Sequence, residues 1–174
     1  MTQDLQIRKS CPKDLPAIKE MYESAFPEED LVPLVNELLD NRDDVLSLVG
    51  IRDDALVAHV AFTICDIENS PHKAALLAPL CVDPSHQKTG IGTTIVKEGL
   101  EQIKAQQIIC ALTLGDPAYY GRFGFTPEKQ ISAPYLIPKE WAEAWQSIQL
   151  DKNAKPPSGN LDVPTPWHHK ELWS

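Results

Sequence analysis

The stretch Pro84–Gly92 constrains the fold more than any other part of this sequence. It separates an apolar run over residues 74–82, typical of a strand, from an amphipathic pattern that begins near Ile91 and is typical of a helix. A second buried strand is predicted over residues 108–114. The middle of the chain therefore predicts a strand–helix–strand unit, in which two parallel strands are joined by a right-handed crossover.

The residues before this unit predict a different kind of pairing. The pattern indicates a strand at 5–8, a helix from its N-cap Asp14 to Pro27, a second helix at 31–41, and strands at 45–51 and 56–65. Asp53 and Asp54 form a turn between the last two strands, so we expect an antiparallel hairpin. The fold class predicted for the whole chain is mixed α/β, with antiparallel strands followed by a parallel β-α-β unit.

Pro79 lies inside the apolar run 74–82. Proline has no N–H group and cannot donate a hydrogen bond to a neighbouring strand. The sequence therefore predicts a bulge or a parting of strands at this position.

Composition and charge exclude several classes of protein. The 174 residues carry a net charge of −9, which argues against nucleic acid or an anionic membrane as the main partner. No apolar run reaches the length of about 18 residues expected of a membrane span, and the start of the chain does not resemble a signal peptide, so we expect a cytoplasmic protein. The four widely spaced cysteines contain no Cys-x-x-Cys pair, and we interpret them as buried apolar residues, with no metal site.

The glycine turn before the helix is a candidate site for phosphate. Backbone N–H groups at a helix N-terminus have no partner inside the helix, and the helix dipole favours an anion there. A P-loop is excluded because Gly90-Ile91-Gly92-Thr93 has neither its spacing nor its lysine. The dinucleotide fingerprint is also incomplete, since Ile95 stands at the third glycine position. On these residues alone, a plain helix-start turn remains an alternative.

Two separate elements together resemble one family. Gln87-x-x-Gly90-x-Gly92, after the strand residues Leu80-Cys81-Val82, resembles the acyl-coenzyme A signature of the GNAT superfamily of N-acetyltransferases. The run Tyr120-Gly121-Arg122-Phe123-Gly124-Phe125 resembles the Tyr-x-x-x-Gly-Phe element of the same family, and residues 115–120 resemble its YhbS-like branch. The resemblance covers residues 5–130 and implies the GNAT-like acyl-CoA N-acyltransferase fold, in which the two parallel strands splay apart.

The resemblance implies where acetyl-coenzyme A would bind as acyl donor. Backbone groups of Leu80, Cys81 and Val82 would pair with the pantetheine arm, as a substitute strand. The pyrophosphate would be held at the start of the helix, by Lys88, Thr89, Gly90, Ile91, Gly92 and Thr93. Gln87 would orient the turn; the alternative is a solvated loop glutamine. Gly90 and Gly92 would let phosphate approach the backbone closely.

The resemblance also implies one catalytic residue. Tyr120 matches the tyrosine that protonates the departing coenzyme A sulfur, and a phenol with a pKa of about 10 carries its proton at pH 7. The alternative is that Tyr120 only packs against Phe123 and Phe125. The oxyanion donor would be a backbone N–H near Cys81 and Val82. Direct transfer is favoured over a covalent route through the Cys81 thiol.

The sequence offers no clear general base. His59 has a suitable intrinsic pKa, but a single strand histidine is commonly a satisfied core residue. Three acidic residues between the first two helices, Glu28, Glu29 and Asp30, would attract a cationic amine or form a solvated helix start. Asp116 is interpreted as a cap of the short helix that Pro117 begins.

The last part of the chain, residues 131–174, is rich in proline and holds all four tryptophans. We expect a helix at 139–147 and a tail packed on the core, within one domain that spans residues 1–174. The predicted function is acetyl-CoA-dependent transfer of an acetyl group to a primary amine of a small molecule or a protein, in a possible homodimer. The alternative is a non-catalytic acyl-CoA sensor or scaffold domain, and a nucleotide-binding protein is a third possibility.

Overall fold

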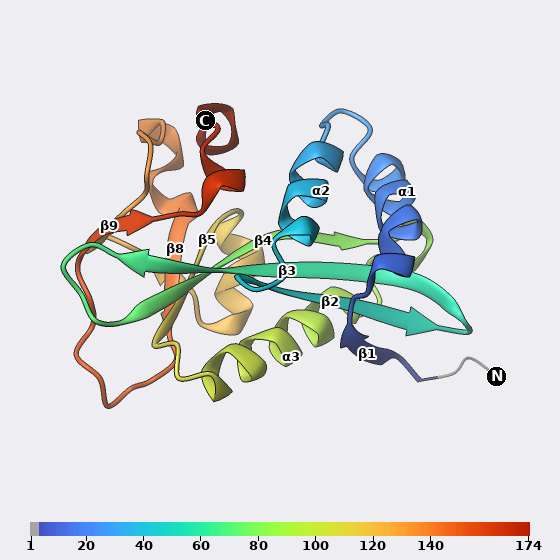
Figure 1. Ribbon diagram of the computed structural model, residues 1–174, viewed down its shortest axis with the longest axis horizontal. Coiled ribbons are helices and arrows are strands. Elements are labelled where there is room, and N and C mark those ends of the chain that lie inside the picture. Colours follow the sequence, from blue (N-terminus) through green and yellow to red (C-terminus); the bar gives the residue numbers. More distant parts are fainter. Residues whose placement is uncertain (1–3) are drawn as a thin grey trace. The chain divides into compact units, whose positions relative to one another are not determined.

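The computed structural model describes residues 4–174, which form two compact units. The first unit comprises residues 4–62 and 79–99, and the second comprises residues 63–78 and 100–174. Strand β3 (Ala55–Ile67), strand β4 (Lys73–Val82) and helix α3 (Ile91–Ala105) each contribute residues to both units (Figure 1). The fold is mixed α/β, and its sheet contains both antiparallel and parallel pairs, as predicted.

The first unit begins with antiparallel strands. Strand β1 (Gln6–Lys9) pairs with β2 (Val45–Arg52), with Gln6 opposite Ile51, and β2 in turn neighbours β3. The turn between β2 and β3 has φ of 50° at Asp53 and 63° at Asp54. A two-residue hairpin turn of this kind requires positive φ at both positions, which aspartate tolerates. The predicted hairpin is confirmed.

Two helices of the first unit, α1 (Leu15–Ala25) and α2 (Val32–Asp40), lie next to each other (Figure 1). Their apolar faces recur at helical spacing and form one buried cluster with residues of the strands. The cluster consists of Ile18, Met21, Tyr22, Val35, Leu39, Val49 and Cys81.

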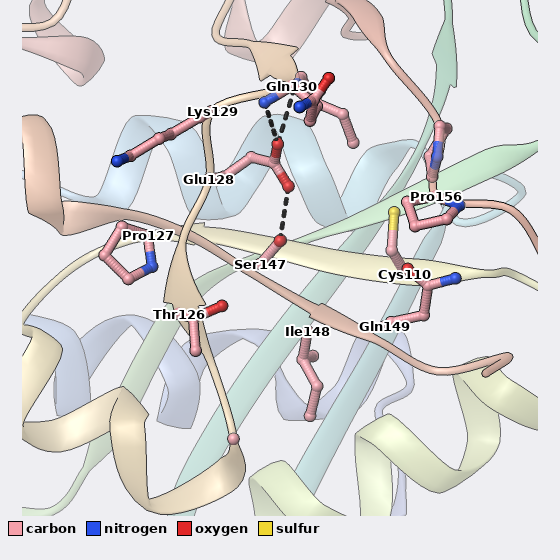
Figure 2. A pocket seen from close by; sticks show the side chains of 13 residues that line it. Cys110, Thr126, Pro127, Glu128, Lys129, Gln130, Ser147, Ile148, Gln149 and Pro156 are labelled. Carbon is pink, nitrogen blue, oxygen red and sulfur yellow. Dashed lines mark hydrogen bonds between the residues drawn. The ribbon is translucent and has the colours of Figure 1, made fainter.

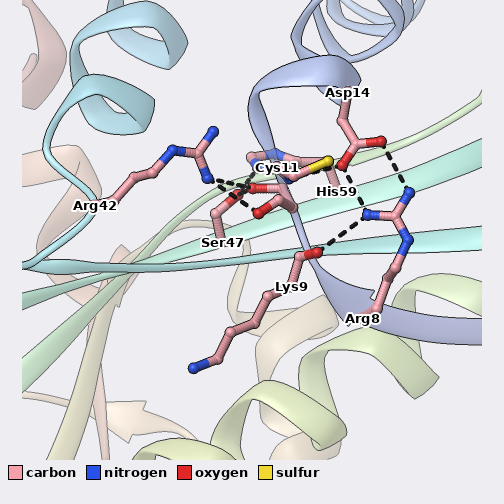
Figure 3. Close-up of polar contacts among 8 residues, drawn as sticks. Arg8, Lys9, Cys11, Asp14, Arg42, Ser47 and His59 are labelled. Atoms are coloured by element: carbon pink, nitrogen blue, oxygen red, sulfur yellow. Dashed lines mark hydrogen bonds and ion pairs between the residues drawn. The ribbon is translucent and has the colours of Figure 1, made fainter.

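The predicted role of Asp14 as a helix N-cap is wrong. Its own backbone is helical, with φ −80° and ψ −17°, and its side chain makes no cap bond to α1. Instead, the carboxylate accepts the Cys11 N–H at 2.8 Å and pairs with both terminal nitrogens of Arg8, at 2.8 and 2.9 Å (Figure 3). The hydrogen bond from Arg8 holds the pKa of Asp14 well below its usual range. A 3-10 turn at Pro12–Asp14 directly precedes α1, and the carboxylate reaches back to the N-cap residue of that turn, Cys11, instead of forward to α1.

The second unit contains the parallel pair. Strand β4 pairs with β5 (Cys110–Leu114) in parallel, and α3 connects them, so the predicted β-α-β unit is confirmed. The strand order in this unit is β3-β4-β5-β8-β6, and β9 pairs with both β3 and β7. The remaining elements are α4 (Pro117–Tyr120), β6 (Thr126–Pro127), β7 (Ile131–Ser132), β8 (Trp145–Gln149) and β9 (Gly159–Asp162).

The helix predicted at 139–147 is wrong. The structure has a 3-10 helix at Lys139–Ala144, followed by strand β8. Along its whole length β8 pairs antiparallel with β5, from Cys110 opposite Gln149 to Leu114 opposite Trp145. Pairing with a buried strand satisfies the backbone of β8, and this tertiary contact outweighs the local preference for helix.

Three of the four tryptophans are buried in the second unit. Trp173 packs edge to face on Trp145 and on Trp167, with ring centroids 5.7 and 5.9 Å apart. The indole N–H of Trp167 donates to the Thr63 hydroxyl at 3.0 Å, which ties the tail to β3. Trp141 differs, because 44% of its surface is exposed. The expected docking of the tail tryptophans therefore holds for three of them.

Two further expectations concern cysteines and membranes. Cys65, Cys81 and Cys110 are buried, as interpreted from their apolar surroundings, whereas Cys11 is only partly buried. Within residues 4–174, every helix is too short or too polar to cross a lipid bilayer.

Candidate active site

The turn that precedes α3 is built by its own side chains. The Asp83 carboxylate accepts a hydrogen bond from the Ser85 N–H at 3.2 Å and contacts Nδ1 of His86 at 3.0 Å. Thr89 closes the turn, because its hydroxyl donates to the His86 carbonyl at 2.6 Å. The turn is therefore held in shape without help from a ligand.

Gly90 has a backbone conformation that other residues rarely adopt. Its φ is +88°, in the left-handed region, so a side chain here would be strained. A Cβ placed on Gly90 would meet no described atom within 4 Å, so the space above this glycine is open. Lys88 also has a positive φ, of 62°. The backbone thus leaves room for a group that approaches Gly90 from outside.

Helix α3 begins at Ile91, directly after this open position. Its first helical hydrogen bond runs from the Thr94 N–H to the Gly90 carbonyl, at 3.0 Å. The N–H groups of Ile91 and Gly92 come before that bond and have no partner within the helix. With the positive end of the helix dipole, these donors can attract an anion.

Gln87 connects the turn to the end of β4. Its side-chain amide donates to the Val82 carbonyl at 3.1 Å. Val82 is the last residue of β4, so this bond fixes the turn relative to the strand that precedes it. Gln87 is exposed, and it makes this contact at the protein surface.

Strands β4 and β5 stop pairing before either strand ends. Their parallel register runs from Ala74 opposite Cys110 to Leu76 opposite Leu112, whereas β4 continues to Val82 and β5 to Leu114. The Leu77 carbonyl accepts a bond from the Thr113 side chain, at 2.8 Å. The parting of strands predicted from Pro79 is therefore present, and it begins two residues earlier than that proline.

Tyr120 lies at the end of α4, against the end of β5. A Cβ on Gly115 would lie 2.5 Å from Cε2 of Tyr120, so the ring rests directly on this glycine. The ring also meets Phe125 edge to face, with centroids 5.7 Å apart. Asp116 caps α4 by accepting the Ala118 N–H at 2.9 Å, as predicted.

The phenol of Tyr120 keeps its proton at neutral pH. Burial raises its pKa to about 12. A protonated phenol can act as a general acid toward a thiolate that forms beside it, and the raised pKa makes it a weaker acid than a free phenol. The packing against Phe125 and the capacity to act as an acid are therefore compatible.

Cys81 is unsuited to act as a nucleophile. Its side chain is buried, with 1% of the residue surface exposed, and burial raises the pKa of the thiol to about 12. The sulfur contacts the Met21 carbonyl at 3.8 Å. Because the thiolate is the reactive form of cysteine, this environment disfavours a covalent route.

His59 is a core residue of the first unit, not a base. Its Nδ1 contacts the Tyr22 hydroxyl at 2.7 Å and its Nε2 contacts the Ser47 hydroxyl at 2.8 Å. Burial lowers the pKa of the imidazole to about 3, so it stays neutral. The chain of contacts continues from Ser47 to the Ser10 hydroxyl at 2.7 Å and to Arg42, which donates to the Ser10 carbonyl at 3.0 Å (Figure 3).

The acidic residues Glu28, Glu29 and Asp30 are exposed in the connection between α1 and α2. This placement fits the solvated helix start that the sequence left open as an alternative. Among residues 4–174, no three His, Cys, Asp or Glu side chains gather where they could hold a metal ion.

A cavity of about 320 Å³ in the second unit has a structural carboxylate in its wall (Figure 2). Glu128 accepts the Ser147 hydroxyl at 2.6 Å and the N–H groups of Gln130 and Ile131 at 2.5 and 2.8 Å. These bonds tie the segment after β6 to β8. The carboxylate is thus occupied within the protein.

Sequence reasoning missed the role of Thr113. The signal was present, because Thr113 is the only polar residue in the run Ile108–Leu114. A hydroxyl inside a buried strand needs a hydrogen-bond partner, and here it donates to the Leu77 carbonyl, where the parallel pairing stops.

Several known proteins are similar to this chain. The N-acetyltransferases YhbS and YjhQ of Escherichia coli K12 are each 29% identical to it, over 149 and 160 residues. The match to YhbS covers 85% of this chain and 87% of YhbS. The match to YjhQ covers 88% of this chain and 88% of YjhQ.

Solved structures agree with these relatives. A crystal structure of YhbS from Escherichia coli in complex with CoA has a TM-score of 0.83 at 27% identity. The match covers 95% of this chain and 92% of the YhbS chain. A GNAT family acetyltransferase from Brucella melitensis in complex with acetyl-CoA has a TM-score of 0.76 at 26% identity. The match covers 94% of this chain and 98% of the Brucella melitensis chain. The sequence model of the acetyltransferase (GNAT) family matches residues 15–125. The chain therefore belongs to the GNAT acetyltransferase family and is classed as an acyltransferase.

Proposed function

We propose that this protein transfers the acetyl group of acetyl-CoA to a primary amine of a small molecule or a protein, by direct attack. The observation that carries the proposal is the turn before α3, where an open left-handed glycine leads into the amides that start a helix. Family membership supports it, as do the YhbS and Brucella melitensis structures, which hold CoA and acetyl-CoA.

The residues of the turn suit the phosphates of that substrate. The N–H groups over residues 88–92, together with Thr89 and Thr93, would hold the pyrophosphate, and Gln87 would keep the turn against the end of β4. The side chain of Lys88 adds positive charge beside it. Backbone groups of Leu80, Cys81 and Val82 would take the pantetheine amides, because β4 continues past its pairing with β5.

Acetyl-CoA supplies an activated thioester. The amine nitrogen forms a bond to the thioester carbonyl carbon and loses a proton to water, and a backbone N–H near Cys81 and Val82 stabilises the oxyanion. The carbon–sulfur bond then breaks, and Tyr120 gives its phenolic proton to the departing sulfur. The buried, neutral His59 takes no part as a base. The acidic net charge of −9 favours a cationic acceptor.

A second candidate is an acyl-CoA sensor or scaffold without turnover. It is favoured by one observation: His59, the candidate base that the strands offer, is occupied on both ring nitrogens. Calorimetry with acetyl-CoA should show binding under both candidates. Only the enzyme releases thiol from acetyl-CoA in the presence of some member of a panel of primary amines.

Tyr120→Phe tests the role of the acid. We expect kcat to fall by about 10²-fold or more, the usual contribution of a general acid, while affinity for CoA stays within about twofold. Tyr119→Phe is the matched control, because Tyr119 packs beside Tyr120 with ring centroids 5.0 Å apart. Equal loss of turnover and affinity in Tyr120→Phe would show that this tyrosine is structural.

The proposal treats residues 1–174 as a single N-acetyltransferase domain, in which residues 131–174 extend a core over about 5–130. A cytoplasmic location and a homodimer remain predictions from the sequence. The acceptor amine is to be identified by the screen described above.

A further inference from the structure

Asp83 is an acidic residue at the entry to a turn that the proposed function assigns to phosphate. It directly follows β4 and precedes the 3-10 turn at Pro84–His86. Hydrogen bonds from Ser85 and His86 lower the pKa of its carboxyl, so the group is charged at neutral pH. Because a carboxylate repels phosphate, the charge of Asp83 on its own is unfavourable at this place.

The carboxylate links two residues of the turn. Its Oδ2 atom accepts the Ser85 N–H at 3.2 Å and also accepts the Ser85 hydroxyl. The same oxygen lies 3.0 Å from Nδ1 of His86. An ionised carboxylate has no proton to give, so Nδ1 of His86 carries the hydrogen and donates it. Three donors from two residues therefore converge on Asp83.

A series of hydrogen bonds runs from β3 to the residue before Gly90. The Asp83 N–H donates to the Val57 carbonyl of β3 at 2.8 Å. The Asp83 side chain holds His86, and the His86 carbonyl accepts the Thr89 hydroxyl at 2.6 Å. Thr89 directly precedes Gly90. The place of Gly90 is therefore set by a strand of the first unit, through Asp83 and His86.

We propose that Asp83 and His86 are positioning residues for acetyl-CoA, which hold the N–H groups before α3 in the arrangement that the pyrophosphate needs. Donors held in place before binding give higher affinity, because the turn does not have to be ordered when the ligand arrives. This gain exceeds the repulsion between carboxylate and phosphate, since salt screens charges near the surface. The inference rests on the proposed function and adds two residues that act through the backbone of residues 88–92.

Asp83→Ala separates the two effects, because they predict opposite results. If positioning dominates, affinity for CoA in titration calorimetry should fall about tenfold. If charge dominates, loss of the carboxylate should tighten the binding of CoA. Pantetheine, which lacks the pyrophosphate, should bind Asp83→Ala and the wild type with affinities within twofold of each other. Unchanged or tighter binding of CoA, or an equal loss for both ligands, would overturn the proposal.

Asp151→Ala is the matched control. Asp151 is an exposed aspartate of the second unit and accepts the Asn153 N–H at 3.0 Å, as Asp83 accepts the N–H of Ser85. Its removal should leave affinity for CoA within twofold. A tenfold loss in this control would show that the effect is not specific to the turn.

A double-mutant cycle tests whether Asp83 and His86 act through one another. Asp83→Ala and His86→Ala break the same series of hydrogen bonds, so the double variant should bind CoA about as weakly as Asp83→Ala alone. Fully additive losses would refute the link between the two side chains. Thermal unfolding of each variant shows whether it is folded at the assay temperature.

Kinetics with acetyl-CoA distinguish this inference from the proposed function. In Asp83→Ala we expect KM for acetyl-CoA to rise about tenfold while kcat stays within twofold, and an equal fall in kcat would contradict a role in binding alone. If the wild type binds no CoA, the proposed function and this inference both fail. If the wild type binds CoA but releases no thiol with any amine, turnover fails, and the calorimetry alone decides the role of Asp83.

Discussion

Replacement of Gly90 by alanine separates the two reasons for a glycine in the turn before α3. The first reason is conformational, because the φ of +88° is costly for any residue with a Cβ. That cost is about 1–2 kcal/mol, and the reduced freedom of the unfolded chain offsets about 0.4–1 kcal/mol of it. The free energy of unfolding should therefore fall by about 1 kcal/mol, which lowers Tm by about 2–4 °C in a chain of this size.

The second reason is the approach of phosphate, and it predicts a larger effect on binding. A Cβ on Gly90 meets no described atom within 4 Å, so the methyl group extends into open space. If the pyrophosphate occupies that space, affinity for CoA should fall by at least tenfold, or about 1.4 kcal/mol. A protein with a stability of about 5–15 kcal/mol stays folded after losing 1 kcal/mol, so unfolding cannot produce this loss.

The assay is titration calorimetry with CoA, accompanied by thermal unfolding of each variant. Gly121→Ala is the control, since a Cβ there also meets no described atom within 4 Å and its φ is −56°. It should change neither Tm nor affinity appreciably. If Gly90→Ala binds CoA as tightly as the wild type, phosphate does not approach this glycine, and the assignment of the turn is refuted.

Two further predictions concern stability. In Gly99→Ala the new Cβ would lie 2.1 Å from the buried ring of Phe62. We therefore expect the free energy of unfolding, measured with denaturant, to fall by about 1–3 kcal/mol, whereas Gly121→Ala stays near the wild type. Equal stability of the two variants would contradict this packing. The pKa of His59 is about 3 in the folded protein, below its ordinary value of 6.5. Between pH 6.5 and about pH 3 the unfolded chain therefore binds one more proton than the folded protein. The free energy of unfolding falls as the pH is lowered through this range. The slope attributable to this group, up to about 1.4 kcal/mol per pH unit, should vanish in His59→Gln, and persistence of the same slope would show that His59 is not its source.

Much of the fold was predictable because its signals are local. The hairpin turn at Asp53 and Asp54, the helix after Gly90 and the apolar strand that contains Pro79 each follow from neighbouring residues. Pro79 also indicated the end of the β4–β5 ladder, although the pairing stops at Leu76 because the Thr113 side chain has already taken the Leu77 carbonyl.

The helix predicted at 139–147 failed because a partner distant in the sequence decides the outcome, whereas the cap predicted at Asp14 failed because of neighbouring residues. Trp145 lies in a strand because β5 needs a partner on its other side. Asp14 faces Arg8, which sits across a turn from it. The surroundings of Cys81 and His59, which make one inert and the other neutral, come from residues far away in the sequence. Of the candidate site, the turn and the tyrosine were visible in the sequence, but their electrostatics and the bond from Thr113 to the Leu77 carbonyl were not.

The early end of the parallel ladder has a consequence for the behaviour of the protein before it meets a substrate. Beyond Leu76 the pairing of β4 with β5 stops, and an unpaired sheet edge of this kind can take up strands from other molecules. Pro79 removes one donor from that edge, so an incoming polypeptide cannot complete its pattern of bonds. A small ligand with a few amide groups loses fewer hydrogen bonds from the missing donor than a polypeptide strand does. Pro79 therefore disfavours pairing between two copies of the protein at this edge.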